Sequence, residues 1–335
     1  MTSASPASAE DRRRRTKQRF LLGGLLFAAL ALVVTWFKNR PYPLNFDPVL
    51  HIPLPPTDAP YKATPTIVVI AVSGSLGLIG LAWAALHGRR QHTWLPVVLA
   101  LSSLAIIVPE VFVDIVGLVW YPTNVHDHAF TIFGRRMGWF IVAGWFSYGP
   151  FLYLIVNLLQ SRPKTKAVWT LWLAAAVWTI PVEELIINYG GCYRYYGNQP
   201  LIIISKLPWW WIPCNSVGVF LAAAITYRLW DRLQGWRSVA TFFITPMSVT
   251  AVYGAIGLPA MIATNADYPW LPTQLCGLLT IALGIFAFAA ILKFVLGRDP
   301  FDMQSTSMFD TLEPAPSDLP AESHKSTMTR TRVGT

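Results

Sequence analysis

Four carboxylic acids stand out in this sequence because each falls inside or beside a long apolar run. Glu110 and Asp114 are four residues apart, so a helix would place both on one face. Glu183 and Glu184 are adjacent, and successive helical residues diverge by about 100°. We therefore expect one of this second pair to face a site and the other to support it or to anchor a loop. An ionisable side chain inside a membrane marks a candidate functional site, and the chemistry that carboxyl groups offer there is proton transfer.

A proline precedes each acidic pair. Pro109 comes directly before Glu110, and Pro181 comes two residues before Glu183. A proline inside a helix frees a backbone carbonyl and bends the axis. We predict that the two bent helices lie at one depth and form the wall of a cavity. The structural alternative is that the acids pair with arginines on the same side, which are Arg135, Arg136 and Arg194.

Aromatic and amide side chains follow the second acidic pair, in "NYGGCYRYYGNQP" (188–200) and "PWWWIP" (208–213). An acid beside a dry aromatic pocket suits carbocation chemistry: the acid protonates an alkene or epoxide, and aromatic faces stabilise the cation. Tryptophans at this depth also form interfacial belts. The Trp cluster is therefore either a belt alone or a belt that also covers a cavity. The predicted cation-stabilising residues are Tyr195, Tyr196, Trp209 and Trp210, and the predicted polar anchors are Asn188, Asn198 and Asn215.

The elements that must position these residues are membrane-spanning helices. The chain has 335 residues, of which 54% are hydrophobic and 13% charged, and its mean hydropathy is +0.44. Soluble domains carry about 25% charged residues, whereas apolar blocks of about 20 residues match the thickness of a bilayer. We predict an all-α, polytopic transmembrane bundle of about eight spans, with seven as the alternative count. The expected spans are Phe20–Phe37, Thr66–Leu86, Trp94–Trp120, Gly138–Leu159, Ala167–Asn188, Leu207–Trp230, Ser238–Ile262 and Leu271–Leu296.

Basic residues are distributed unevenly about these spans. Nineteen of the 26 Lys and Arg residues fall on the side of the N-terminal tail, and seven fall on the other side. The positive-inside rule then places both termini in the cytosol, in a multi-pass protein that we expect in the endoplasmic reticulum membrane. This topology explains much of the net charge of +9, so no nucleic-acid partner is expected. We expect residues 1–19 and 297–335 to be disordered cytosolic tails and residues 20–296 to form the catalytic bundle; a cleaved signal peptide is the alternative for the first span.

The remaining motifs are weaker. The loop "NVHDHAF" contains His126, Asp127 and His128 but no identifiable further ligand, so no metal or other cofactor is expected. Three cysteines are too few for a disulfide framework, although Cys192 and Cys214 leave one bridge open. Glycines inside or at the ends of the spans predict close helix packing, namely Gly74, Gly77, Gly80, Gly138 and Gly144.

Over roughly residues 66–296 the chain resembles the integral-membrane terpene cyclases of fungal meroterpenoid pathways, of the ascofuranone and macrophorin type. The resemblance rests on the many spans, the intramembrane acids and the stretch "PVEELIINYGGCYRYYGNQP". It implies a metal-independent cyclase that protonates an epoxide or olefin of a prenylated aromatic substrate. Glu183 or Glu184 would be the general acid, and Glu110 or Asp114 its partner or base. The chain departs from the compact members of that group, which have fewer spans and carry the acids in an early and a late helix.

Two other classes of function stay open. A proton-coupled transporter of a lipophilic metabolite would use the acids as a relay and would have broken helices at matching positions. A ligand-binding or structural membrane protein would instead have the acids in salt bridges. The oligomeric state is not indicated by the sequence.

Overall fold

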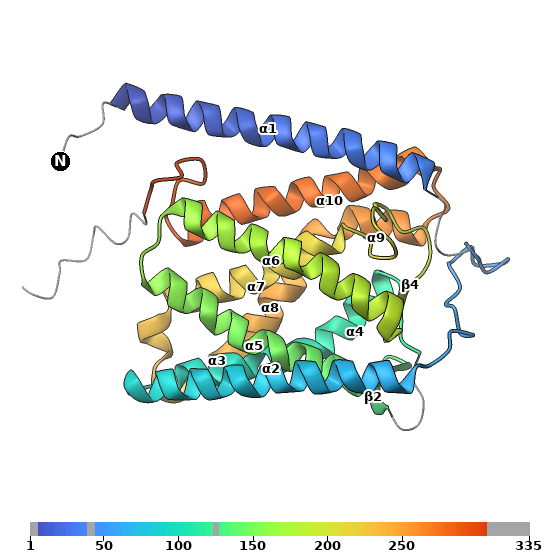
Figure 1. Cartoon of the computed structure of the whole chain (residues 1–335), viewed down its shortest axis with the longest axis horizontal. Coiled ribbons are helices and arrows are strands. Elements are labelled where there is room, and N and C mark those ends of the chain that lie inside the picture. Colours follow the sequence, from blue (N-terminus) through green and yellow to red (C-terminus); the bar gives the residue numbers. More distant parts are fainter. Residues whose placement is uncertain (1–5, 39–43, 123–126, 307–335) are drawn as a thin grey trace, which may run out of the picture.

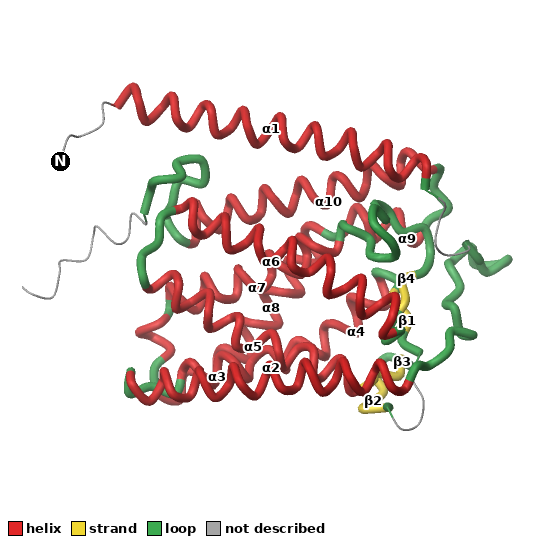
Figure 2. Tube along the Cα trace, viewed as in Figure 1, coloured by secondary structure: helices red, strands yellow, loops and turns green. Residues whose placement is uncertain are grey.

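The computed structural model describes residues 6–38, 44–122 and 127–306. Its long helices run side by side and alternate in direction, so the connections lie at the two ends of the bundle (Figure 1). The described strands are short and gather at one end (Figure 2). The helices are α1 (Pro6–Phe37), α2 (Ala63–Arg90), α3 (Leu95–Ser102), α4 (Ile107–Val116), α5 (Trp139–Gln160), α6 (Thr165–Leu185), α7 (Trp211–Arg228), α8 (Thr241–Ile256), α9 (Leu258–Asn265) and α10 (Trp270–Ala290). The strands are β1 (Val119–Trp120), β2 (His128–Ile132), β3 (Arg135–Gly138) and β4 (Arg194–Tyr195).

Short 3₁₀-helical and π-helical turns interrupt or extend these elements. Two of them matter for the site: the 3₁₀ turn η1 (Ser103–Ile106) joins α3 to α4, and the π-helical turn η2 (Ile186–Gly190) ends α6. The others are the 3₁₀ turns η3 (Trp230–Leu233) and η4 (Gly235–Ala240) and the π-helical turn η5 (Ile291–Val295). β1 pairs antiparallel with β4, and β2 pairs antiparallel with β3.

Seven helical segments in the described part of the chain are long and apolar enough to cross a membrane. They confirm the prediction of an all-α transmembrane bundle. The segments are Glu10–Phe37, Ala63–Arg90, Leu95–Val116, Trp139–Gln160, Thr165–Gly190, Gly235–Ile256 and Trp270–Val295.

The remaining predicted span is α7, which differs from the seven because it lies in the interior of the bundle. Most of its 18 residues are buried, and α5, α6, α8 and α10 pack around it. Protein rather than lipid surrounds this helix, so it tolerates Asn215, Ser216 and Thr226. Close packing against α8 depends on Gly218, where an added Cβ would lie 2.8 Å from the Cα of Val249.

Helix α1 lies at the edge of the bundle, alongside α10 (Figure 1). Ring contacts attach its apolar part: Phe20 packs on Trp169 at 5.0 Å, Phe27 stacks on Trp209 at 6.1 Å, and Trp36 meets Trp270 edge-on at 4.9 Å. The indole N–H of Trp270 also donates to Thr35 O at 3.3 Å. Most of its large apolar side chains are exposed in the isolated chain, as expected for a helix that faces lipid.

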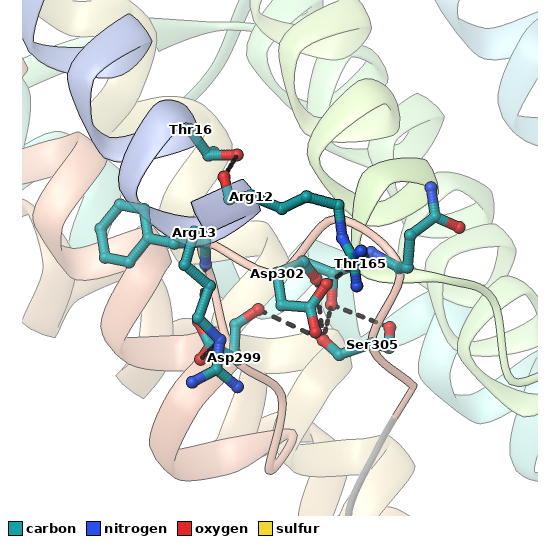
Figure 3. Close-up of polar contacts among 9 residues, drawn as sticks. Arg12, Arg13, Thr16, Thr165, Asp299, Asp302 and Ser305 are labelled. Carbon is teal, nitrogen blue, oxygen red and sulfur yellow. Dashed lines mark hydrogen bonds and ion pairs between the residues drawn. The ribbon is translucent and has the colours of Figure 1, made fainter. Parts of the chain in front are cut away.

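The two ends of the described chain meet, and both are more ordered than the sequence suggests. Residues 6–19, which we expect to be disordered, continue α1 as helix, because Ala, Glu, Arg and Lys are good helix formers. Residues 297–306 fold back on the start of α6, where the Thr165 N–H donates to Ser305 O at 2.9 Å. An ion pair of 3.1 Å between Arg13 and Asp299 joins the two segments (Figure 3). Residues 1–5 and 307–335 of the expected tails lie outside the described residues.

Candidate active site

The acidic residues of α4 and α6 come together in the half of the bundle that ends at the strands. In the first of these spans the 3₁₀ turn η1 interrupts the α-helix just before Pro109, whereas α6 continues as α-helix through Pro181. The ring of Pro109 clashes with the carbonyl four residues earlier, which disfavours a continuous α-helix there. Glu110 and Asp114 of α4 lie within electrostatic range of Glu183 on α6. These three residues are called the carboxyl cluster below.

Two of the three carboxyl groups accept hydrogen bonds from tyrosines. The Tyr121 hydroxyl donates to Asp114, and the Tyr193 hydroxyl donates to Glu183. The third carboxyl differs: Glu110 Oε2 is buried and has no hydrogen-bond partner among the described residues. A buried polar atom without a partner costs about 1–3 kcal/mol, so a ligand that bonds to this oxygen would relieve that cost.

An aromatic wall surrounds the carboxyl cluster. Its rings contact one another in sequence with centroid separations of 5.4–6.2 Å. The indole N–H of Trp211 is a second buried polar group with no partner among the described residues. The wall consists of Tyr121, Phe140, Tyr193, Tyr195, Trp211 and Tyr253.

Two phenols of the wall that lie beyond the membrane-spanning segments, Tyr121 and Tyr195, are held in their neutral form. Burial, together with the nearby carboxyl charges, raises the pKa of Tyr121 and of Tyr195 well above the ordinary value. Both hydroxyls therefore stay protonated, and that of Tyr121 donates to Asp114, while both rings present negative π-faces.

Glu184, the neighbour of Glu183, has a different task. Its carboxylate accepts the backbone N–H groups of Ser205, Lys206 and Leu207 at 2.9, 3.0 and 3.3 Å. Asn188 Nδ2 donates to the same carboxylate at 2.8 Å. This is the geometry of a loop anchor, which is one of the two roles that the sequence allows for one member of the pair.

The predicted cation-stabilising residues are separated by the structure. Tyr195 belongs to the wall, at 5.6 Å from Trp211. Trp210 packs behind Trp211 with a centroid separation of 4.4 Å and tilted rings, and its indole N–H donates to Gln199 at 3.0 Å. Trp209 instead packs on Phe27 of α1, and the Tyr196 hydroxyl accepts from Arg135 at 3.0 Å.

The predicted polar anchors are likewise spread over several tasks. Asn215 lies beside the wall, where its Oδ1 accepts from the Tyr253 hydroxyl. Asn188 binds Glu184, as described above. Asn198 ties two loops together, since its Nδ2 donates to Tyr268 O and to Thr273 Oγ1 at 3.0 and 2.8 Å.

Sequence reasoning does not select Tyr121, Phe140 or Tyr253 as site residues. Tyr121 lies beyond the end of α4 at Val116 and directly after β1, so helical periodicity from the acids does not select it, and its nearness in the chain to Asp114 is its local signal. Phe140 and Tyr253 have no such local signal, because they come from other helices that only the packing brings to the cluster.

The structure bears on two alternatives that the sequence leaves open, salt bridges of the acids with arginines and a disulfide bond. Within the described residues none of the four acids forms a salt bridge with Arg135, Arg136 or Arg194. Arg135 instead lies over the Trp120 ring at 5.3 Å. The three cysteines are free thiols, so the bridge between Cys192 and Cys214 is not formed.

The "HDH" motif is only partly covered by the structure. His126 lies outside the described residues, and the His128 ring shares a hydrogen bond of 2.8 Å with Thr131 at the exposed β2–β3 hairpin. No group of three or more His, Cys, Asp or Glu side chains suited to a metal occurs in residues 6–38, 44–122 and 127–306.

The fold and the site thus define a multi-pass membrane protein with a buried carboxyl cluster enclosed by aromatic rings. Comparisons of the chain with protein-family models, curated proteins and solved structures gave no match.

Proposed function

We propose that this protein is a membrane-embedded terpene cyclase that protonates an epoxide or olefin of a prenylated aromatic substrate. The observation that supports this most directly is the buried Oε2 of Glu110, which has no hydrogen-bond partner among the described residues and lies within electrostatic range of Tyr121 and Tyr253 of the aromatic wall. Such a substrate is lipophilic and would approach from the bilayer, for which we propose the endoplasmic reticulum membrane.

In this proposal Glu110 is the proton donor. Three negative charges within electrostatic range in a low-dielectric interior would repel one another strongly, which favours at least one protonated member. Asp114 and Glu183 each accept a tyrosine hydroxyl, whereas Glu110 Oε2 is left to face a ligand. The order of roles differs from the sequence-based expectation, in which Glu183 or Glu184 is the donor.

The reaction proposed is an isomerisation. The proton from Glu110 adds to the epoxide oxygen or to an olefinic carbon, and in the epoxide the C–O bond breaks with its electron pair on oxygen. Olefinic π electrons of the prenyl chain then form new C–C bonds as the cation moves along it. Asp114 or Glu183 removes the final proton, so atoms and electrons balance without an oxidant. The aromatic wall stabilises the cation and excludes water.

Substitution of the cluster tests this proposal. Glu110→Gln, Asp114→Asn and Glu183→Gln, each in microsomes supplied with a farnesyl-phenol epoxide, should lower product formation about 100-fold or more, as expected for loss of a general acid or base. Asp267→Asn removes an exposed acid on the same side and should leave the rate unchanged. Wild-type rates in all three cluster variants, or no conversion of the epoxide and of its olefin by the wild type, would contradict the proposal.

A proton-coupled transporter is the second candidate, and the interruption of the α3–α4 span by η1 is the feature that favours it. Sealed vesicles distinguish the two. Uptake of the farnesyl phenol that depends on a pH gradient and is lost in Glu110→Gln, without formation of a cyclised product, would support transport.

A further inference from the structure

Four basic side chains lie near the outer end of α6, close to Glu184 or Asn188. Lys38, Lys62, Arg194 and Lys206 come from four separate segments, and each is half-buried rather than extended into solvent. Within the described residues none of them forms a salt bridge. Lys62, Arg194 and Lys206 are called the basic rim below.

The surrounding backbone holds the rim in place. The Lys206 N–H is bound by Glu184, and Lys62 Nζ donates to Asn188 O at 3.4 Å. The aliphatic part of Lys62 crosses Gly191, where a Cβ would lie 3.0 Å from Lys62 Cδ and where φ is +63°. Arg194 is fixed by the pairing of β4 with Trp120 in β1.

The charges of the rim are only partly balanced by the protein, because Glu184 supplies one negative charge beside three positive ones. Burial lowers the pKa of Lys206, and the neighbouring charges of Arg194 and Lys62 lower it further; only Glu184 opposes this. The Glu184 carboxylate is already occupied by backbone N–H groups and by Asn188. Half-buried like charges are unfavourable unless an anion accompanies them.

Capping of the C-terminal end of α6 explains only part of this arrangement. A cation near the last carbonyl groups of a helix is favourable, and Lys62 bonds to the Asn188 carbonyl in this way. The side chains of Arg194 and Lys206, in contrast, have no hydrogen-bond acceptor within the described part of the chain. Two donors therefore remain for a ligand.

The rim and the aromatic wall are built from the same short stretch of chain. Tyr193 and Tyr195 point to the wall, as their ring contacts show. Alternate residues of an extended segment point to opposite sides, so Arg194 between them faces the rim. Glu183 and Glu184 divide in the same way, one toward each side. A molecule whose polar end occupies the rim would thus have its hydrocarbon chain close to the carboxyl cluster.

We propose that Lys62, Arg194 and Lys206 bind the carboxylate of an amphiphilic substrate, a prenylated aromatic acid, at the outer mouth of the bundle. The substrate role rests on the proposed function, whereas the binding of an organic anion does not. The rim fixes the head group, and the length of the prenyl chain then decides which double bond or epoxide reaches Glu110.

Binding to the purified protein in nanodiscs of neutral phosphatidylcholine tests the rim without catalysis. The probes are a farnesylated hydroxybenzoic acid and its methyl ester, which differ only in charge, and the signal is the fluorescence of the tryptophans. The acid should bind about tenfold more tightly than the ester, as expected for charge-assisted hydrogen bonds. Arg194→Gln and Lys206→Gln should each remove most of this preference and leave the affinity for the ester unchanged.

A matched control and a stability measurement accompany these variants. Arg136→Gln removes an exposed arginine from the neighbouring hairpin and should leave both affinities unchanged. Lys206→Gln should not lower the melting temperature, because it removes a charge that its neighbours repel. Equal binding of acid and ester by the wild type, or wild-type acid binding in both rim variants, would overturn the proposal.

Two further arms separate this inference from its alternatives. Glu110→Gln should bind the acid as the wild type does. A wild-type protein that prefers the acid over the ester but converts neither the epoxide nor its olefin would leave the rim standing and the cyclase proposal refuted. Nanodiscs that contain phosphatidic acid test whether the rim binds the phosphate of a lipid head group instead of a substrate carboxylate. Specific binding of that lipid, abolished by Arg194→Gln and accompanied by no preference for acid over ester, would assign the rim to a lipid head group and overturn the substrate role.

Discussion

Glu183 and Glu184 are neighbours in the chain with opposite surroundings. The angular step of the helix turns Glu183 toward Tyr193 and the carboxyl cluster, and Glu184 toward the loop that contains Ser205. The sequence predicts this division but not which residue takes which role, because the loop bound by Glu184 lies about twenty residues further along the chain. The same holds for Glu110, whose lack of a partner depends on packing that no local pattern describes.

The anchoring role of Glu184 is testable at the level of the residue. Glu184→Ala leaves the three N–H groups of 205–207 without their acceptor, and hydrogen bonds to a charged group contribute about 1.5–3 kcal/mol each. We expect a lower melting temperature and faster hydrogen exchange of the 205–207 amides, measured by mass spectrometry in nanodiscs.

The comparison with Glu183 makes this prediction specific. Glu183→Gln retains an oxygen that accepts from Tyr193, so exchange at 205–207 should stay as in the wild type while turnover falls. Unchanged exchange at these amides in Glu184→Ala would show that the loop is held by other contacts.

At the scale of elements, small residues determine how closely the helices approach. Gly77 and Gly80 of α2 are contacted by Phe146 and Pro150 of α5, as the glycine pattern of the sequence predicts: an added Cβ would lie 2.3 Å from each of these side chains. Gly74 and Gly144 have no atom within 4 Å of such a Cβ and face away from the contacts. Spacing alone therefore identifies glycine-rich helices but not the face that packs.

The tightest of these approaches is at a glycine that the sequence pattern does not single out. A Cβ at Gly149 of α5 would lie 1.8 Å from the carbonyl oxygen of Ala100 in α3, a backbone atom that cannot rotate away. Gly149→Ala should therefore force α3 and α5 apart and destabilise the protein by about 1–3 kcal/mol or more, as overpacking does. The measurement is the thermal unfolding midpoint in detergent.

Gly144→Ala on the same helix is the matched control, because its Cβ meets open space. It should be neutral or slightly stabilising, since alanine favours the helix by about 1 kcal/mol relative to glycine. Equal midpoints for the two variants would mean that the close approach of α3 and α5 is not as described.

At the scale of the whole molecule, hydrophobicity predicts the spans better than it predicts their surroundings. Blocks of apolar residues place most of the spans within a few residues, because the bilayer requires a nearly constant length. The exceptions are α1, which begins at Pro6 and not at Phe20, and the predicted span Ser238–Ile262, which is divided into α8 and α9. Which helix is central is another matter. α7 is surrounded by protein and therefore contains polar residues, so composition makes it the least membrane-like span although it is the most enclosed. The contacts that build the carboxyl cluster also join α4, α5, α6, α7 and α8, and such long-range packing is not contained in any local stretch.

The side of the membrane on which the later connections and the C-terminal segment lie depends on whether α7 crosses the bilayer. With α7 as a crossing helix, the connection after it lies on the same side as the connection between α5 and α6, and Arg13 and Asp299 meet on that side as the ion pair requires. Without α7 as a crossing helix, the connection after it and the end of the chain would move to the other side. Single exposed cysteines in a background with Cys192, Cys214 and Cys276 replaced by serine distinguish the two arrangements, with positions Ser161, Asp231, Asp58 and Asp267.

A membrane-impermeant maleimide applied to sealed microsomes should label Ser161→Cys and Asp231→Cys together, from the outside of the vesicle, which corresponds to the cytosol. Asp58→Cys and Asp267→Cys should be labelled only after the vesicles are permeabilised. The positive-inside rule predicts this orientation from the excess of basic residues on the side of the N-terminal tail. If Asp231→Cys were labelled only after permeabilisation, as Asp58→Cys is, α7 would not cross the membrane. Since α7 carries Trp211 and Asn215, that outcome would also remove the far side of the aromatic wall from the site.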